Sequence, residues 1–412
     1  MAEVKPLPAL HYNLAAVPSL ADVTAPPYDV IDARQRAALL TRSPLNVVEI
    51  DLPESPGDGD PYEHAAETLE AWTLDGVLTA DREPTIWALT QDYATSDGDR
   101  RTRHGFLARV RLTDYGPGLV RPHERTHPGP KEDRLRLTRA TRHNLSPIFA
   151  LHPGEVWSEI DPHLAGDPWG EVTDDEGTIH RVWRIADPSV HDAVAARLED
   201  AELLIADGHH RYETARIYAD EIGGEGPHRY ALMCLVSLED PGVTILGTHR
   251  LLGDFDADQL ERGVREHFEL EDVTDAEVDP AGAEGPGVFG LIGAEGPRRL
   301  RLRDPKAIDA ALPDRSAAYR TLDAVILEEL VLKGTLGMSD EDIAAKRGLG
   351  YATAIGDAKA RLEEGAYGAA FLLRPTPVSQ VREVAAAGET MPPKSTFFFP
   401  KLLTGIVFNP LS

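Results

Sequence analysis

The amino-acid sequence predicts an α/β protein with a mixed sheet, and three observations lead to this class. Apolar runs of strand length occur between stretches of helical composition along most of the chain. An Asp-Gly turn joins two strand-like segments, 85–94 and 103–112, which predicts an antiparallel hairpin. The buried-strand run 203–206 is followed, after a glycine, by a helical pattern. The 412 residues are too many for one small core, so we expect two domains, 1–270 and 271–412.

The N-terminal half reads as follows. Pro26-Pro27 fixes an extended entry, so Tyr28 and Asp29 are predicted on an ordered loop rather than in a helix. A helix is expected to begin near Asp32, and the apolar run NVVEID (46–51) then reads as a strand. Further helices are expected at 62–72, 131–142 and 189–200, and further strands at 146–151 and 178–185.

The second half continues with a buried strand at 229–238 and a second strand at 242–252 paired with it. The acidic, Gly/Pro-rich region 271–298 is interpreted as a domain boundary or an inserted hairpin. Beyond it we expect helices at 318–333, 356–364 and 377–388, and a strand at 368–375. The apolar C-terminal segment is expected to pack back into the functional site rather than to fray.

The composition excludes several classes of protein. The net charge is −27, from 69 acidic and 42 basic residues, which argues against nucleic-acid and anionic-membrane partners. High acidity with scarce lysine is the composition that a salt-rich cytosol favours, so we expect the protein to work in one. The single cysteine, Cys234, excludes an internal disulfide and is expected in the core. No run of 18 apolar residues occurs, so we expect a soluble, cytoplasmic protein.

The strongest candidate site is the stretch LLIADGHHRYETA (203–215). A strand, a glycine turn and a helix aim the N–H groups of a helix N-terminus at an anion. Arg211 and the imidazoles of His209 and His210 make this turn rich in donors, so a phosphate is the expected guest. The alternative is an ordinary strand–helix corner in which Asp207 caps the helix.

The segment His123–His127 fits the H-E-x-x-H pattern of zinc peptidases. Prolines at 128 and 130 are expected to break any helix that carries His127, which argues against zinc. Glu124 is better used as a general base or Mg²⁺ ligand on an ordered loop, with His123 beside it.

Basic residues follow these motifs. Lys131 and Arg134 lie on one predicted helix, where they either contact phosphate oxygens or belong to a solvated face. Residues 388–395 nearly match a P-loop, with Lys394 and Ser395 in place, but Pro393 removes an N–H that a phosphate cradle needs. A Walker-type nucleotide fold is therefore excluded. Lys131, Lys394 and Lys401 nevertheless indicate a chemical role for these segments, because the chain otherwise avoids lysine.

Five ordered motifs together resemble a large bacterial and archaeal family catalogued as a domain of unknown function. They are PPYDVI, HERTHPGPKEDRL, ADGHHRYETA, THR (248–250) and MPPKSTFFFPKLLTGIVF. The third motif is in turn similar to the phosphate-contacting motif of the ParB/sulfiredoxin-like group, which includes free serine kinases and ParB-type nucleotide-binding proteins. The resemblance implies a ParB/sulfiredoxin-like core elaborated by a further α/β region. Sulfiredoxin activity is not expected, since its catalytic cysteine is absent from the turn.

The resemblance implies a kinase that transfers a phosphoryl group from ATP, or from ADP or pyrophosphate, to free L-serine with Mg²⁺. The alternatives are a ParB-like protein that binds and hydrolyses nucleotide as a regulatory switch, and the zinc peptidase. Catalysis is expected from Glu124, His123 and Asp207, with Asp207 or Glu124 as the Mg²⁺ ligand. The phosphate- and nucleotide-binding residues are expected to be Gly208, His209, His210, Arg211, Lys131, Arg134, Lys394, Ser395, Thr396 and Lys401. Tyr28, Asp29 and Arg250 are expected to bind the substrate. The oligomeric state is left open.

Overall fold

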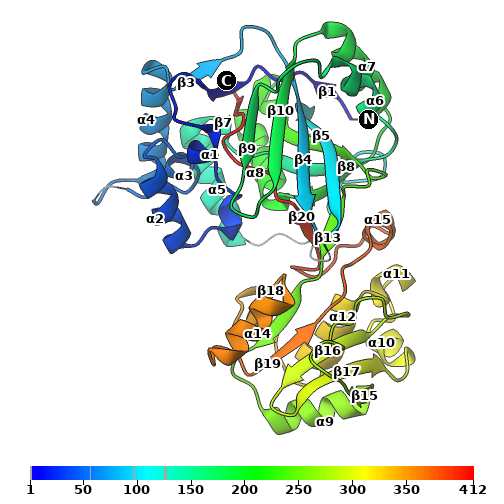
Figure 1. Ribbon diagram of the computed structural model, residues 1–412. Helices are drawn as coiled ribbons and strands as arrows, with labels where there is room; N and C mark the ends of the chain where they lie inside the picture. Colours follow the sequence, from blue (N-terminus) through cyan, green and yellow to red (C-terminus); the bar gives the residue numbers. More distant parts are fainter. Residues whose placement is uncertain (1, 56, 96–97, 125–127) are drawn as a thin grey trace. The chain divides into compact units, whose positions relative to one another are not determined.

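The chain forms two compact units (Figure 1). The computed structural model describes residues 2–55, 57–95, 98–124 and 128–412, with the backbone alone at 128–130. The first unit contains Met1–Pro122, Thr126–Thr244 and Pro400–Ser412, and the second contains His123–Arg125 and Ile245–Phe399. The boundary expected near residue 270 therefore falls inside the second unit, within β15 (Phe268–Asp272).

A mixed sheet of nine strands, counted over the described residues, organises the first unit in the order β6-β11-β8-β12-β5-β4-β10-β9, with β1 beside β5. β11 is parallel to β6 and antiparallel to β8, and β8 is parallel to β12. The predicted mixed α/β class is thus confirmed, as is the hairpin β4–β5. β9 and β10 form a further antiparallel pair. The strands are β1 (Val4–Lys5), β4 (Ile86–Ala94), β5 (Arg100–Arg111), β6 (Val120–Arg121), β8 (Ile148–His152), β9 (Gly170–Thr173), β10 (Ile179–Ile185), β11 (Leu203–Asp207) and β12 (Tyr230–Ser237).

Helices pack around this sheet with the end signals that the sequence carries. Asp32 and Gln35 form a capping box at the start of α2, and Asp60 and Asp187 cap α4 and α7 ahead of a proline. The helices are α1 (Leu20–Val23), α2 (Ala33–Arg42), α3 (Val48–Asp51), α4 (Pro61–Leu74), α5 (Pro128–Thr141), α6 (Trp157–Ile160), α7 (Pro188–Leu198) and α8 (His209–Ile222). Short 3₁₀ turns are Tyr28–Val30, Asp161–His163 and Pro227–Arg229, so Tyr28 and Asp29 lie in one helical turn rather than in a plain loop.

The strand predicted at 46–51 is wrong. This run forms the helical turn α3, because the Asn46 side chain accepts a hydrogen bond from the Val48 N–H and donates to the Asp22 and Thr24 carbonyls. Asn46 and most of α3 are buried. A short apolar run that is buried on every side has the same pattern in a strand and in a helix.

The prolines after His127 lie at the start of a helix. α5 begins at Pro128, so Pro128 and Pro130 lie in its first turn, where the backbone N–H groups have no partner within the helix. The helix expected from Lys131 therefore begins three residues earlier. The prediction that these prolines break a helix carrying His127 stays a prediction, because His127 lies outside the described residues.

The second unit is built on an antiparallel sheet, described in the order β15-β17-β16-β19-β14-β18. Its strands are β14 (His249–Leu252), β15, β16 (Val288–Gly293), β17 (Gly296–Leu302), β18 (Leu349–Ala352) and β19 (Ala369–Leu372). Its helices are α9 (Ala257–His267), α10 (Lys306–Ala311), α11 (Ala317–Arg320), α12 (Asp323–Leu327), a π-helix (Glu328–Lys333), α13 (Asp340–Ala344), α14 (Ile355–Glu363) and α15 (Val378–Ala386). The hairpin β16–β17 confirms the inserted-hairpin interpretation of the Gly/Pro-rich region.

Two expectations for this half are wrong. The segment 242–252 does not pair with β12; it divides into β13 (Thr244–Leu246) and β14, and β14 pairs with β18 and β19. Gly247 separates the two strands where a Cβ would lie 2.4 Å from the Leu373 carbonyl. The helix expected at 318–333 is interrupted between α11, which ends at Arg320, and α12, which begins at Asp323. The Asp323 carboxylate accepts hydrogen bonds from the Gly287 N–H and from Arg374.

The apolar C-terminal segment is not frayed. After β20 (Phe397–Phe399) it returns to the first unit, where Thr404 and Phe408 form backbone bridges with Ala25 and Leu10. β21 (Asn409–Pro410) then pairs with β7 (His143–Asn144), while β2 (Leu10–Tyr12) pairs with β3 (Leu78–Ala80). Among the helices described, none is long and apolar enough to cross a membrane.

Candidate functional site

The turn between β11 and α8 has the predicted strand–glycine–helix geometry. β11 ends at Asp207, Gly208 is the N-cap with φ of 93°, and α8 begins at His209. A Cβ at Gly208 would lie 3.0 Å from the Nε of Arg211 and 3.1 Å from its Cζ. Two features therefore favour glycine at this position: its left-handed backbone conformation and the guanidinium of Arg211, which occupies the space a Cβ would need.

Two cations meet at Asp207. Its Oδ2 lies 3.5 Å from the Nη2 of Arg211 and 3.5 Å from the Nζ of Lys401. Arg211 also donates from Nη1 to the Pro147 carbonyl. Two positive side chains against one carboxylate at a helix N-terminus make a turn suited to binding an anion. Lys401 lies 194 positions along from Asp207, so the C-terminal segment contributes a side chain to this turn.

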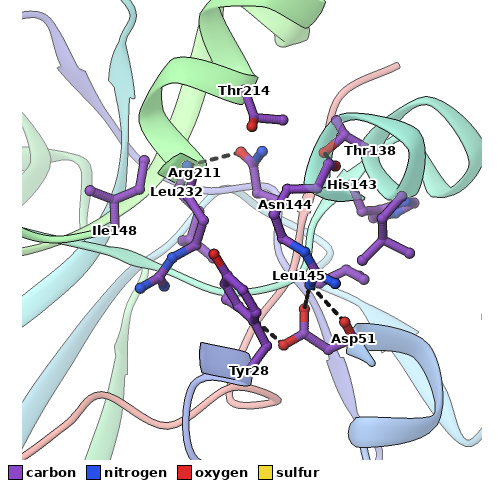
Figure 2. Close-up of a pocket in the computed structure, with 13 residues that line it drawn as sticks. Tyr28, Asp51, Thr138, His143, Asn144, Leu145, Ile148, Arg211, Thr214 and Leu232 are labelled. Carbon is purple, nitrogen blue, oxygen red and sulfur yellow. Dashed lines mark hydrogen bonds and ion pairs between the residues drawn. The ribbon is translucent and has the colours of Figure 1, made fainter. Parts of the chain in front are cut away.

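Beside this turn a cavity of about 40 Å³ opens between α5, β7 and α8 (Figure 2). Arg134 is 5% exposed and donates from Nη1 to the carbonyl and Oδ1 of Asp51, at 2.7 and 3.2 Å. Its guanidinium lies 4.2 Å from the ring centre of Tyr28. Ser146 donates to the other oxygen of Asp51. The cavity is lined by Tyr28, Asp51, Arg134, Leu137, Thr138, His143, Asn144, Leu145, Ser146, Ile148, Arg211, Thr214 and Leu232.

Burial shifts the pKa values of the ionisable groups around this cavity, and neighbouring charges oppose that shift. It raises the pKa of Asp51, against the opposing effect of Arg134 and Arg211. It also raises the pKa of Tyr28 to about 12. For Arg134, burial lowers the pKa, but the carboxylates of Asp51 and Asp133 outweigh it and the pKa rises. The Nε of Arg211 and the hydroxyl of Thr214 are buried and have no hydrogen-bond partner among the described residues. The cavity can therefore hold water or a small polar group.

The other predicted residues of the first unit lie as follows. Lys131 pairs with Glu213 of α8, at 3.4 Å. Arg134 contacts Asp51 and Asp133 rather than open solvent. His209 is buried and His210 half-buried at the start of α8, and Asp29 is exposed.

A second group of predicted residues meets in the second unit. Met391 donates its N–H to the His123 carbonyl, and the Lys394 N–H donates to Oε1 of Glu124 at 2.9 Å. The Nε2 of His123 lies 2.8 Å from the Thr396 hydroxyl, and Ser395 donates to the Pro392 carbonyl. Lys394 has φ of 61°, a conformation that a non-glycine residue adopts at some cost. The motifs at 123–124 and 391–396 thus form one structure.

Arg250 is buried in the same unit. Its guanidinium lies 5.3 Å from the Tyr351 ring centre, and burial lowers its pKa against the opposing effect of Tyr351, Glu328 and Glu124. Arg250 therefore lies in the electric field of Glu124.

A preformed metal centre is not found in the described part of the chain, where no three His, Cys, Asp or Glu side chains converge. His127 of the zinc pattern lies outside that part. Mg²⁺ is commonly held by one or two carboxylates and the substrate phosphates, so Asp207 or Glu124 fits such a role without a protein cluster.

Sequence reasoning missed Arg103, Gln91, Asp51 and Ser146. Arg103 and Gln91 lie on the hairpin β4–β5, where polar residues of an alternating strand are expected to face solvent, yet both are buried. Asp51 was assigned to the end of a strand. Their partners are distant in sequence, so no local pattern indicates them.

Several solved structures are similar to this chain. A conserved hypothetical protein from Pyrococcus furiosus is 16% identical, with a TM-score of 0.36, and the match covers 69% of this chain and 88% of that one. A mutant free serine kinase in complex with ADP is 15% identical, with a TM-score of 0.38 and coverage of 68% and 83%. C-terminally truncated SbnI from Staphylococcus aureus is 12% identical, with a TM-score of 0.36 and coverage of 72% and 85%.

No curated protein matches the chain. A family profile matches residues 4–325, most of the chain and four of the five motifs, and confirms the resemblance. The protein therefore belongs to the family described as "Protein of unknown function (DUF1015)".

Proposed function

We propose that this protein is a small-metabolite kinase that transfers a phosphoryl group from ATP, ADP or pyrophosphate to the hydroxyl of free L-serine. One observation carries the proposal: the Gly208 turn opens α8, and Arg211 and Lys401 both lie 3.5 Å from Oδ2 of Asp207. Phosphoryl transfer depends mainly on positioning and charge neutralisation, which such a turn supplies. The segment ADGHHRYETA resembles the motif of free serine kinases, and this resemblance is the reason for proposing free L-serine as the acceptor.

Each residue of the turn has a role in this proposal. The backbone at Gly208 to His210 and the side chains of Arg211 and Lys401 hold the transferred group. Asp207 would be the ligand for Mg²⁺, which would supply charge neutralisation for the donor phosphates. Glu124 and His123, the predicted bases, belong to the second unit, and a separate variant of each tests that prediction.

The cavity beside the turn is proposed to hold the charged end of the acceptor. At about 40 Å³ it is too small for a nucleotide. The unpartnered Nε of Arg211 and hydroxyl of Thr214 would donate to a carboxylate there.

Product analysis tests the function. The protein is incubated with L-serine, Mg²⁺ and one donor at a time (ATP, ADP, CTP or pyrophosphate), and O-phosphoserine is measured by mass spectrometry. We expect O-phosphoserine with at least one donor, and its loss in Arg211→Gln. Arg216→Gln is the matched control, because Arg216 lies on the same helix, pairs with exposed Asp114 and lies 5.0 Å from the ring centre of Tyr115.

Other results would contradict the kinase. Nucleotide hydrolysis that is indifferent to serine would favour the ParB-like regulatory protein. Peptidase activity abolished by a zinc chelator would favour the zinc peptidase.

A further inference from the structure

Arg103 is a buried cation near the start of β5. Its side chain is fully enclosed, with the residue 1% exposed, and it lies 4.6 Å from the ring centre of Phe149. The guanidinium donates from Nε to Oε1 of Gln91 at 2.9 Å, and from Nη2 to the Pro400 carbonyl. Its Nη1 makes no hydrogen bond to any described residue.

The charge of Arg103 is not neutralised locally. Within the described chain no carboxylate lies within 4.0 Å of its guanidinium, whereas the similarly buried Arg134 has Asp51 and Asp133 at 3.2 and 2.7 Å. Burial lowers the pKa of Arg103 to about 10, and Asp240 and Asp207 act on it only from a distance. A buried charge without a partner is costly, so a site that keeps one usually receives an opposite charge from elsewhere.

The position of Arg103 indicates where that charge comes from. Phe149, beneath its guanidinium, is the register partner of Asp207, the last residue before the Gly208 turn. Arg103 holds the carbonyl of Pro400, and Gln91 donates from Nε2 to the carbonyl of Lys401 at 3.0 Å. These bonds fix the backbone from which Lys401 reaches Asp207.

Further hydrogen bonds hold Gln91 in turn. Its Nε2 lies 3.1 Å from Nδ1 of His180, whose Nε2 lies 2.9 Å from Asp174. Burial lowers the pKa of His180, so the neutral ring donates to Asp174 and accepts from Gln91. The amide of Gln91 is therefore oriented with its oxygen on Arg103.

We infer that Arg103 is a positioning residue of an anion site at the Asp207–Arg211 turn, where it fixes Lys401 and supplies a positive charge that bound phosphate neutralises. The inference rests on the proposed phosphate site, and it does not depend on serine as the acceptor. The ligand class is an inorganic or nucleotide polyphosphate.

Pyrophosphate binding to the full-length protein tests this inference, measured by calorimetry at fixed ionic strength. We expect Arg103→Met to weaken pyrophosphate binding at least tenfold. The matched control is Arg298→Met, since Arg298 is also buried but pairs with Glu261 in the second unit. The control is expected to melt earlier and to bind pyrophosphate like the wild type. Wild-type affinity in Arg103→Met, or an equal loss in Arg298→Met, would overturn the inference.

If Arg103→Met does not fold, the variant Gln91→Glu tests the inference instead. This isosteric change places a carboxylate against Arg103, so the internal charge competes with the ligand. We expect pyrophosphate to bind at least tenfold more weakly; unchanged affinity refutes the inference. Its failure is distinguishable from that of the kinase proposal. Arg103-dependent pyrophosphate binding without O-phosphoserine refutes only the kinase, and O-phosphoserine formation with Arg103-independent binding refutes only this inference.

Discussion

At the scale of single residues, the account depends on Gly208 and on the groups that its turn brings together. Gly208 combines a φ of 93° with an arginine whose Nε would lie 3.0 Å from a Cβ, so the backbone conformation and the placement of Arg211 are coupled at one position. Thr214, one turn further along α8, presents a buried hydroxyl that no described group satisfies. A substitution at Gly208 and one at Thr214, each with a control variant, distinguish an effect on protein stability from an effect on ligand binding.

Gly208→Ala is expected to destabilise the protein by about 1–2 kcal/mol, because alanine is strained at positive φ, and to displace Arg211. Urea unfolding measures the first effect and pyrophosphate binding the second. Gly224→Ala is the control, since Gly224 has φ of 66° near the other end of α8 with open space around it. It is expected to lose stability alone. Equal pyrophosphate affinity in both variants would contradict the role of the turn.

Thr214→Val keeps the shape of the side chain and removes its hydroxyl. If the hydroxyl binds the acceptor carboxylate, KM for serine rises roughly three- to tenfold, the value of one hydrogen bond, while KM for the donor stays constant. Thr214→Ser is expected to retain wild-type KM. Steady-state kinetics with each substrate varied in turn gives the answer, and an unchanged KM for serine would remove the cavity from the acceptor site.

At the scale of elements, a buried histidine joins two strands of the second unit. The Nδ1 of His249, in β14, accepts a hydrogen bond from the N–H of Leu373, which follows β19. Burial lowers the pKa of His249 to about 4, below its ordinary value of 6.5. The folded state thus excludes a proton that the unfolded chain binds.

The sign of the pH effect follows from linkage. Above about pH 6.5 the ring is neutral in both states and its contribution to stability is complete, and this contribution is lost as the pH falls toward 4. The loss reaches about 3 kcal/mol, at 1.36 kcal/mol per pH unit. His249→Gln is expected to flatten this part of the stability curve, and exposed His163→Gln is expected to leave it unchanged. Chemical denaturation between pH 4 and 7 measures both, and an unaltered slope in His249→Gln would contradict the assignment.

Elements and site residues differ in how far the sequence predicts them. The Gly208 turn is predictable because its signals, an apolar run, a glycine and a helical pattern, lie within 13 consecutive residues, 203–215. The role of Arg103 is not predictable in this way, because the Pro400 carbonyl to which it donates is 297 residues away in the sequence. The run at 46–51 was assigned to a strand because the Asn46 contacts that make it helical are tertiary. Gly247, between β13 and β14, is close to the Leu373 carbonyl, where a Cβ would lie 2.4 Å away. This contact is also distant in sequence, so no local pattern predicts the break between the two strands.

At the scale of the whole molecule, charge dominates. A net charge of −27 repels itself in the compact state, and added salt screens that repulsion. The melting temperature is therefore expected to rise between low and molar KCl. Calorimetry in KCl measures it, and a melting temperature that does not change with salt would contradict an adaptation to a salt-rich interior.

The central claim is that donor phosphates bind at the Gly208 turn. A crystal structure of the protein with Mg²⁺ and ADP tests it most directly. The account predicts a phosphate within hydrogen-bond distance of the backbone at 208–210, with Arg211 and Lys401 on its oxygens. Well-ordered phosphates bound elsewhere, with the turn unchanged and empty, would contradict it.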